Sequence, residues 1–439
     1  MKNIIISILS NATVLLFVVM PYSCFARTYE EKYADVLKHY SSNVSDSLKY
    51  RAAQFLINNI DGHYSPEGAQ ITAFISMIET IEKKTGIKEL NLAWNNASKY
   101  GGVILVPDSG IVTCRMLISN IDEAFNAWTS AYWYPDVDFH SFCKYILPYR
   151  CSSEHIGGNW RSYLYKKYHD LIKNETDIRK AFAIIKKAVF DDVILSNSYC
   201  PYAIDAISCH RIGKAECGQR CILLVDVLRS LGIPAVIDMI PMWSDYSNKS
   251  HSWVSIVWNN ATYTVNENDT IAKENNPIDA SLFTPRYHLK KEDNCPYYVK
   301  TTKTPVKVYR EEYWRETDNT FPTNSLLHDV SKQYGLNSHV ILNTNTDKEV
   351  FLCTYLSAND WKPIAKQKAT NKKVVFNNVG KNTVCTAYVI EDNGEKKYIT
   401  PPFLVGTNGI EKAFVASNTV KEEIQINRKY PLCQYTVQT

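Results

Sequence analysis

Two residues whose side chains can carry out acyl transfer stand near the middle of the chain. Cys217 lies in AECGQRCILLVDVL, and His251 opens the stretch HSWVSIVW. A thiol becomes a good nucleophile when its thiolate is stabilised, and a neighbouring imidazole can serve as its general base. The two residues therefore indicate a thiol acyl-transfer site, on the condition that the fold brings them together.

The segment around Cys217 predicts a helix that is buried in the core. Its apolar positions follow the i, i+3, i+4, i+7 spacing of one helix face: Cys221, Leu224, Val225 and Leu228. Gly232 and Pro234 end the helix, and residues 235–239 predict a strand. Cys217 is thus expected at the helix N-terminus, where the dipole and free N–H groups stabilise a thiolate and hold an oxyanion.

His251 is expected at the start of a β-hairpin. HSWVSIVW alternates as a strand does, Asn259-Asn260 predict the turn, and residues 262–265 predict the returning strand. A catalytic histidine needs a third group that orients its ring. The neighbouring strand suits that group, because cross-strand neighbours lie about 5 Å apart.

The run ECGQRCILLVDVLRSLGIPA, followed by HSWVSIVW, resembles the transglutaminase-like core. The features that carry the resemblance are a cysteine that opens a helix, the Leu-Arg-x-Leu-Gly-Ile-Pro ending of that helix, and a His-x-Trp strand. The resemblance implies Cys217 as nucleophile and His251 as general base. Other stretches, among them AAQFLINNIDGHYS, FCKYILPYR and PPFLV, are similar to one bacterial group of exported transglutaminase-like proteins.

The third catalytic position departs from the family pattern. The family places an Asp four residues after an aromatic residue of the returning strand, and with Tyr263 as that aromatic the position holds Glu267. Glu267 is the favoured orienting residue. Asn266, in the manner of papain-like enzymes, and Asp269 remain alternatives.

Other residues near the pair have two interpretations each. Trp243 and Trp253 can line a substrate groove, or they can pack the hairpin onto the helix. Cys217 itself can instead be a structural thiol or form a disulfide with Cys209 or Cys221. The 12 cysteines have no metal-site spacing, so neither a metal nor an organic cofactor is implied.

The N-terminus has the layout of a secretory signal peptide, with cleavage after Ala26. The protein is therefore expected in the periplasm or outside the cell. Cys24 offers a second possibility, a lipid anchor. No later segment is apolar enough to cross a membrane.

The whole chain predicts an α+β fold in three parts: a helical N-terminal region, a transglutaminase-like (papain-like) core and a C-terminal β-sandwich. The core includes a helix pair followed by an irregular stretch over residues 196–213. The expected boundaries are a signal peptide at 1–26, the helical region at 27–154, the core at 155–285, a connector at 286–320, the sandwich at 321–410 and a tail at 411–439.

The charge composition bears on which class of molecule the protein binds. Lys+Arg 49 against Asp+Glu 45 gives a net charge of +4, which does not favour nucleic acid. The expected activity is hydrolysis of a peptide or another amide-bearing substrate, carried by a glycan or protein of the cell surface. The alternative is an inactive transglutaminase-like scaffold that binds glycan or peptide there.

Overall fold

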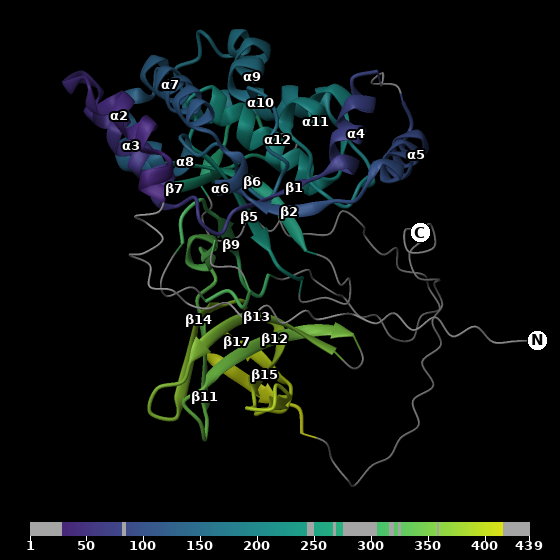
Figure 1. Cartoon of the computed structure of the whole chain (residues 1–439). Coiled ribbons are helices and arrows are strands. Elements are labelled where there is room, and N and C mark those ends of the chain that lie inside the picture. The colour runs from purple at the N-terminus through teal and green to yellow at the C-terminus, as the bar shows by residue number, and fades with distance from the viewer. Residues whose placement is uncertain are drawn as a thin grey trace, which may run out of the picture.

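Helices and sheets lie in separate layers in the computed structural model of the chain, a mixed α+β structure (Figure 1). The helices fill one side of the molecule, a central sheet lies beneath them, and the C-terminal sheets lie on the far side of it. The structure describes residues 29–80, 85–243, 250–266, 269–274, 305–315, 320–323, 326–357 and 360–415. The expected signal peptide, Cys24 and most of the expected tail lie outside these ranges.

The N-terminal part is mainly helical, as its sequence predicts. Its helices are α2 (Ala34–Ser41), α3 (Ser47–Asn58), α4 (Ala69–Ile78), α5 (Ile87–Ala97), α6 (Asp108–Ile111), α7 (Cys114–Ser130) and α8 (Phe139–Tyr145). A two-stranded sheet of β1 (Tyr64–Glu67) and β2 (Ile104–Pro107) lies among them. The apolar residues Ala53, Leu56 and Ile57 of α3 are all buried, so this helix packs with one face on the core.

A second group of helices follows without a separate core. It comprises α9 (Trp160–Tyr168), α10 (Ile178–Asp192), α11 (Ala206–Ile212) and α12 (Cys217–Ser230), with the short parallel pair β3 (Ile194–Leu195) and β4 (Lys214–Ala215). One hydrophobic cluster runs from Tyr33 in the N-terminal part to Val265 beyond the central hairpin. The two regions expected on either side of residue 154 therefore share one core.

The central sheet recruits strands from far along the chain. Its order is β10-β9-β5-β6-β7-β8, with β10 (Leu327–Asp329), β9 (Tyr309–Glu311), β5 (Ala235–Ile240), β6 (His251–Trp258), β7 (Ala261–Thr264) and β8 (Lys273–Glu274). β9 lies in the range expected as a connector, and β10 lies in the range expected for the sandwich. The structure differs from the sequence prediction here, because both strands extend the central sheet.

The C-terminal part consists of antiparallel sheets around a second core. β11 (Ser338–Asn343) pairs with β14 (Lys373–Val379). The other sheet has the order β13 (Asp360–Lys368), β12 (Glu349–Ser357), β15 (Thr383–Ile390), β17 (Phe403–Gly406) and β18 (Gly409–Ala413), with β16 (Lys396–Tyr398) beside β15. Side chains of both sheets, among them Val340, Leu352 and Val389, meet in one cluster.

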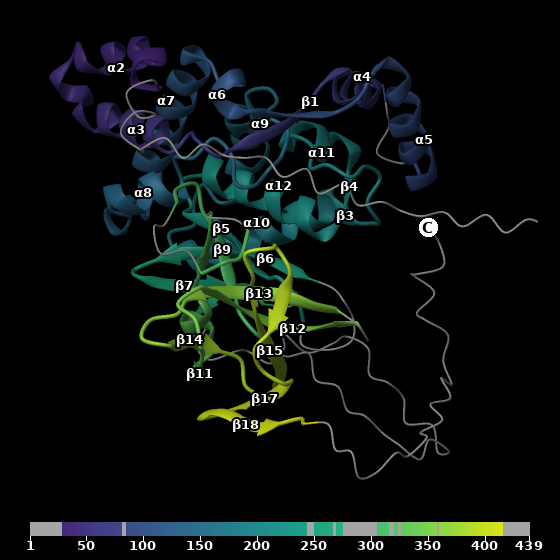
Figure 2. The same cartoon turned by 60° about the horizontal axis from the view of Figure 1, so that its bottom comes forward.

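The helix α12 lies at the centre of the molecule (Figures 1 and 2). Helices α9 and α10 contact it on one side, and strands β5 and β6 contact it on the other. It ends as predicted: Gly232 has φ +71°, and a β-carbon there would lie 2.3 Å from the carbonyl oxygen of Ala127. Only glycine fits this close approach in a left-handed conformation.

The buried Arg229 binds the end of α12 to its surroundings. Its guanidinium donates to the carbonyl oxygens of Tyr145 at 3.1 Å, Ala235 at 3.1 Å and Arg150 at 2.7 Å. These bonds join α12 to the segment before α9 and to the first residue of β5. Arg229 therefore fixes the helix by binding backbone carbonyls inside the core.

Asp226 is a second ionisable residue on the buried part of α12. Its side chain is 2% exposed, and its Oδ1 has no hydrogen-bond partner among the described residues. Burial raises the pKa of Asp226 well above the usual carboxyl value, and the charge of Glu154 adds to the effect. Burial thus favours the neutral form of this carboxyl group.

Asp226→Asn should stabilise the protein at neutral pH. The unfolded chain loses the Asp226 proton above about pH 4, whereas the native state keeps it, so native stability falls as the pH rises from there towards the native pKa. The neutral amide removes this loss, which amounts to about 1.4 kcal/mol per pH unit. Urea unfolding between pH 4 and pH 8 should show a gain for the variant that shrinks towards pH 4; parallel profiles would contradict a neutral Asp226.

Candidate active site

Cys217 is the first residue of α12, as the sequence predicts. The residue before it, Glu216, caps the helix: its carboxylate accepts the N–H groups of Gly218 at 2.9 Å and Gln219 at 2.8 Å. These are two of the free helix-terminal N–H groups that were expected to stabilise a thiolate or an oxyanion. In the structure they are occupied by a side chain of the protein itself.

The side chain of Cys217 is exposed, and its thiol lies close to the carboxylate of Glu216. Sγ lies 3.5 Å from Oε2 of Glu216. Partial burial of the sulfur raises the pKa of Cys217, and the negative charge of Glu216 raises it further. The net effect on the pKa favours the protonated thiol, although the backbone N–H groups of Gly218 and Cys217 at the helix start act in the opposite direction. A thiolate at this position needs a cation beside it.

His251 lies at the same end of the core as Cys217, because α12 and β6 run parallel. At one end, the thiol of Cys221, one turn into α12, donates to the carbonyl oxygen of Ser252 at 3.6 Å. At the other end, the N–H of Val257 donates to the carbonyl oxygen of Pro234 at 3.0 Å. The beginnings of the helix and the strand are therefore adjacent, and they carry Cys217 and His251.

The hairpin after His251 has the predicted turn. Asn259 and Asn260 have φ angles of 49° and 59°, and the register places Trp258 opposite Ala261 and Ile256 opposite Tyr263. Two central residues with positive φ form the tight turn that suits the twist of a hairpin.

Glu267, the favoured orienting residue, lies outside the described residues, and its role stays a prediction. Of the two alternatives, Asp269 accepts the backbone N–H of Asn266 at 3.0 Å and the ammonium of Lys273 at 2.8 Å. Partial burial acts to raise the pKa of Asp269, but these bonds lower it overall. The contacts described for Asp269 thus belong to its own loop.

The rings of Trp243 and Trp253 both contact the His251 ring, with centroid distances of 5.8 Å each. Their side chains are only 4% and 9% exposed, within a cluster that also holds Tyr334. The cluster as described holds no residue of α12, so the two rings pack against Tyr334 and its neighbours, and the groove-lining role stays a prediction. Their rings restrict where the imidazole can lie.

A buried network of hydrogen bonds links Trp253, on the strand that begins with His251, to the neighbouring strands of the central sheet. The indole N–H of Trp253 donates to the hydroxyl of Tyr334 at 2.9 Å, and that hydroxyl donates to Asp238 on β5. Asp238 also receives two hydrogen bonds from Arg310 of β9, at 2.8 Å and 2.9 Å. The sequence prediction missed this network. Its one local signal is the charged Asp238 within the otherwise apolar strand AVIDMI.

The cysteine and acidic side chains also bear on two other kinds of site, a disulfide bond and a metal site. Cys209, Cys217 and Cys221 are all free thiols. Within the described residues, one group has metal-ligand side chains within 4.8 Å of one another: Cys151, Glu154 and Asp226. Both oxygens of Glu154 already accept backbone N–H groups, each at 2.9 Å, so this acid holds its own turn together.

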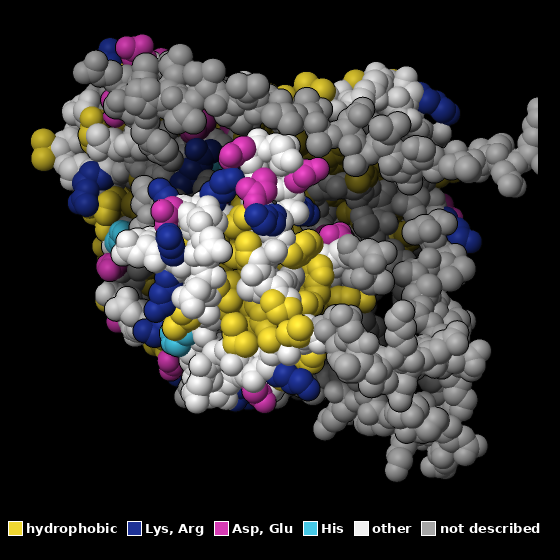
Figure 3. Space-filling model, turned by 90° about the horizontal axis from the view of Figure 1, so that it is seen from below, with side chains coloured by type: hydrophobic (Ala, Val, Ile, Leu, Met, Phe, Trp, Pro, Cys, Tyr) yellow, Lys and Arg dark blue, Asp and Glu magenta, His cyan; other side chains and the backbone are white. Residues whose placement is uncertain are grey.

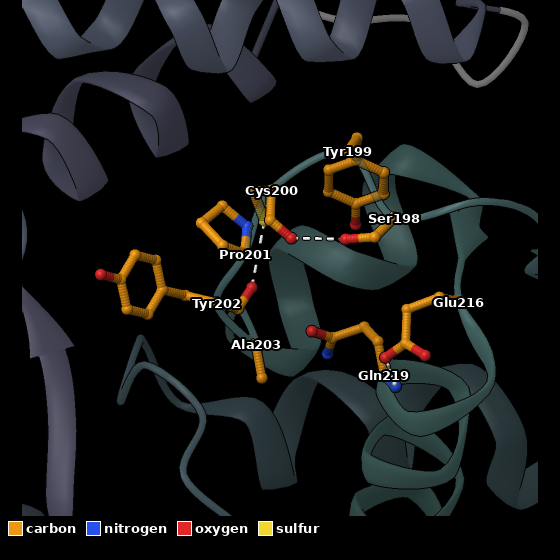
Figure 4. Close-up of a pocket in the computed structure, with 8 residues that line it drawn as sticks. All are labelled: Ser198, Tyr199, Cys200, Pro201, Tyr202, Ala203, Glu216 and Gln219. Atoms are coloured by element: carbon orange, nitrogen blue, oxygen red, sulfur yellow. Dashed lines mark hydrogen bonds between the residues drawn. The ribbon is translucent and has the colours of Figure 1, made fainter. Parts of the chain in front are cut away.

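A cavity of about 320 Å³ opens beside the start of α12 (Figure 4). Its lining consists of Ser198, Tyr199, Cys200, Pro201, Tyr202, Ala203, Glu216 and Gln219. Glu216 and Gln219 stand on either side of Cys217 in the sequence, so the cavity lies beside the helix turn that carries the candidate nucleophile, although Cys217 itself is not part of the lining. The sequence predicted only irregular structure for the loop that forms its other wall.

Comparisons with known proteins leave the family open. No protein-family model matches the chain, and no curated protein matches it. Among solved structures, it is similar to a putative cysteine protease from Cytophaga hutchinsonii, at 10% identity and a TM-score of 0.22. The match covers 54% of each chain, about half the length of that protein. A TM-score this low assigns neither a fold nor an activity.

In the part of the chain that the structure describes, no helix has both the length and the apolar character needed to cross a membrane.

Glu216→Gln should make Cys217 more reactive. The amide can still accept the helix N–H groups, but it carries no charge to oppose a thiolate. We expect the apparent pKa of Cys217 to fall and its alkylation by iodoacetamide at pH 7 to become several-fold faster, as measured by peptide mass spectrometry. An unchanged or slower rate would show that Glu216 does not control the thiol.

Tyr334→Phe should destabilise the protein and displace the histidine strand. The substitution leaves the indole N–H of Trp253 and an oxygen of Asp238 without this partner inside the core, at a cost of about 1–3 kcal/mol. We expect a lower thermal midpoint and a shift of the tryptophan emission spectrum, to which Trp253 contributes. A variant as stable as the parent would mean that water or another side chain replaces the hydroxyl.

Proposed function

We propose that the protein is an exported thiol acyl-transfer enzyme, a peptide or amide hydrolase with a transglutaminase-like (papain-like) core and a C-terminal β-sandwich. The observation that carries the proposal is the parallel packing of α12 on β6, which sets Cys217 and His251 at adjacent element starts. A cysteine at a helix start beside a histidine strand is the arrangement that acyl transfer by a thiol requires.

The proposed reaction has two halves. The imidazole of His251 takes the proton of the Cys217 thiol, and the sulfur attacks the amide carbonyl carbon. The tetrahedral intermediate collapses as the C–N bond breaks, and the imidazolium gives its proton to the leaving amine. Water, deprotonated by His251, then attacks the thioester, and the carboxylic acid and the free thiol are released. Glu267 would orient His251 throughout.

Localisation is part of the same proposal. The signal-peptide layout of residues 1–26 supports export to the periplasm or the cell exterior, with Cys24 as a possible point of lipid attachment. Peptide or amide bonds of cell-surface proteins or glycans are then the substrates within reach.

Alkylation kinetics test the Cys–His pair within one protein, because the chain contains its own reference. Cys114 is also the first residue of a helix, α7, but no His-x-Trp strand accompanies it in the sequence. We expect Cys217 to react with iodoacetamide faster than Cys114 at pH 6–7, and His251→Ala to remove the difference. Equal rates in the parent protein would sink the enzyme proposal.

Hydrolysis gives the second readout. Cys217→Ala should abolish cleavage of a fluorogenic peptide library, and His251→Ala should lower kcat by about 10²-fold or more. Cys114→Ala should leave cleavage unchanged. Cleavage that survives in Cys217→Ala would place the nucleophile elsewhere.

The second candidate function, an inactive scaffold that binds glycan or peptide, has one observation in its favour. The face of the molecule seen from below, where the C-terminal sheets lie, carries a gathering of hydrophobic side chains (Figure 3). Exposed hydrophobic residues of these sheets include Tyr355, Ile390 and Tyr398. A slow, ordinary Cys217 would make this surface the better subject for binding studies.

A further inference from the structure

The cavity beside α12 opens at the same helix start that carries Cys217. One wall is the loop from Ser198 to Ala203, and the other is the first turn of α12 with Glu216 and Gln219 (Figure 4). Cys217 stands between these two residues in the sequence. If Cys217 is the nucleophile, as proposed above, the cavity is the candidate site for a side chain of the molecule whose amide bond is attacked.

The loop wall is held in place by bonds from both sides. The side-chain amide of Gln219 accepts the N–H of Ile204 at 2.8 Å and donates to its carbonyl oxygen at 3.0 Å. From the N-terminal helices, Phe74 contacts Tyr199 with a centroid distance of 6.2 Å, and Trp94 contacts Tyr202 at 6.0 Å. The cavity is therefore formed before a ligand enters, and α4 and α5 support one of its walls.

Tyr199 brings a polar atom that lacks a partner. Its side chain is 4% exposed, and within the described part of the chain its hydroxyl makes no hydrogen bond. Figure 4 shows that hydroxyl directed towards the side of the cavity where Glu216 and Gln219 lie. A buried hydroxyl without a partner costs about 1–3 kcal/mol, so a polar group of a ligand would be favoured there.

The charge of the cavity is negative. Glu216 is the charged member of its lining, and no Lys or Arg belongs to the lining set. Its carboxylate accepts two N–H groups and the thiol of Cys217, which leaves room for one further donor among its four lone-pair sites. Burial raises the pKa values of Tyr199 and Cys200, and the charge of Glu216 raises both further, so its field reaches the opposite wall.

The remaining lining is suited to a hydrocarbon stem. Pro201, Ala203 and the ring of Tyr199 present apolar surface, and the polar atoms of Glu216 and Tyr199 are available to the tip of an entering group. A side chain with an apolar stem and a cationic tip matches this distribution. A carboxylate tip would meet Glu216 and be repelled.

We propose that this cavity is a specificity subsite for a basic side chain, lysine or arginine, of a peptide substrate close to the bond that is cleaved. The carboxylate of Glu216 binds the cation, and the hydroxyl of Tyr199 accepts a hydrogen bond from it. The proposal rests on the proposed function only for the identity of the attacked bond. Occupation of the cavity can be measured without catalysis.

The test uses the full-length Cys217→Ala protein and calorimetric titration. The probes are alanine hexapeptides that carry one lysine, norleucine or glutamate, moved through each position. We expect the best lysine peptide to bind at least tenfold tighter than its norleucine counterpart and the glutamate peptide to bind most weakly. Norleucine keeps the stem and lacks only the charge, so the ratio isolates the cation.

Two further variants assign the contacts. Tyr199→Phe, which removes only the unpartnered hydroxyl, should reduce the lysine-to-norleucine ratio about threefold or more, whereas Tyr132→Phe, at an exposed position, should not change it. Glu216→Gln should abolish the ratio. Equal binding of lysine and norleucine peptides, no measurable binding of lysine peptides at 1 mM, or an unchanged ratio in Tyr199→Phe would each overturn the subsite.

The outcome separates this inference from the proposed function. A lysine preference in binding, with no cleavage by the parent protein, would support the subsite and sink the hydrolase. Cleavage by the parent protein without any preference for a basic residue would do the reverse.

Discussion

The packing of α12 between outer helices and the central sheet constrains everything near the site. Every residue of the helix from Cys221 to Ser230 is buried. The surrounding core therefore holds this part of the helix on all sides. Its far end is held by Arg229 through three carbonyl groups, and its near end touches β6 through Cys221. Only the first turn reaches solvent, and that turn carries Cys217. The thiol is thus positioned by the core of the protein, whereas a thiol on a surface loop would depend on that loop.

Local sequence patterns predicted the elements around the site well, because each has a cause within a few residues. Gly232 ends α12 since no β-carbon fits beside Ala127, and Asn259-Asn260 turn the hairpin since both adopt positive φ. The pairing of β9 with β5, and of β10 with β9, could not be predicted in this way. Periodicity shows that a strand has a buried face, but it does not show which distant strand will lie beside it. The same holds for Asp238: its ion-pair partner Arg310 lies on β9, far away in the sequence, and only the folded chain shows that the two residues meet.

The site itself shows a similar limit. A helix start favours a thiolate only if its N–H groups are free, and the residue that takes two of them, Glu216, lies directly before the cysteine. Glutamate is not among the preferred N-cap residues, so residue preference alone does not predict this cap. The cavity was missed for a different reason. It is formed by an irregular loop that α4 and α5 support, and irregular segments carry no periodic signal.

Glu216 takes part in three features at once: the cap of α12, the field at Cys217 and the wall of the cavity. Its charge disfavours a thiolate but favours an imidazolium, so its effects on a Cys217–His251 ion pair oppose each other. A thiolate with a higher pKa is also the stronger nucleophile once formed. If a cationic side chain binds to Glu216, as proposed for the subsite, it neutralises the charge that raises the pKa of Cys217. Substrate binding would then lower the pKa of the thiol at the moment when an amide bond lies beside it, in addition to the activation by His251 that is proposed for the free enzyme.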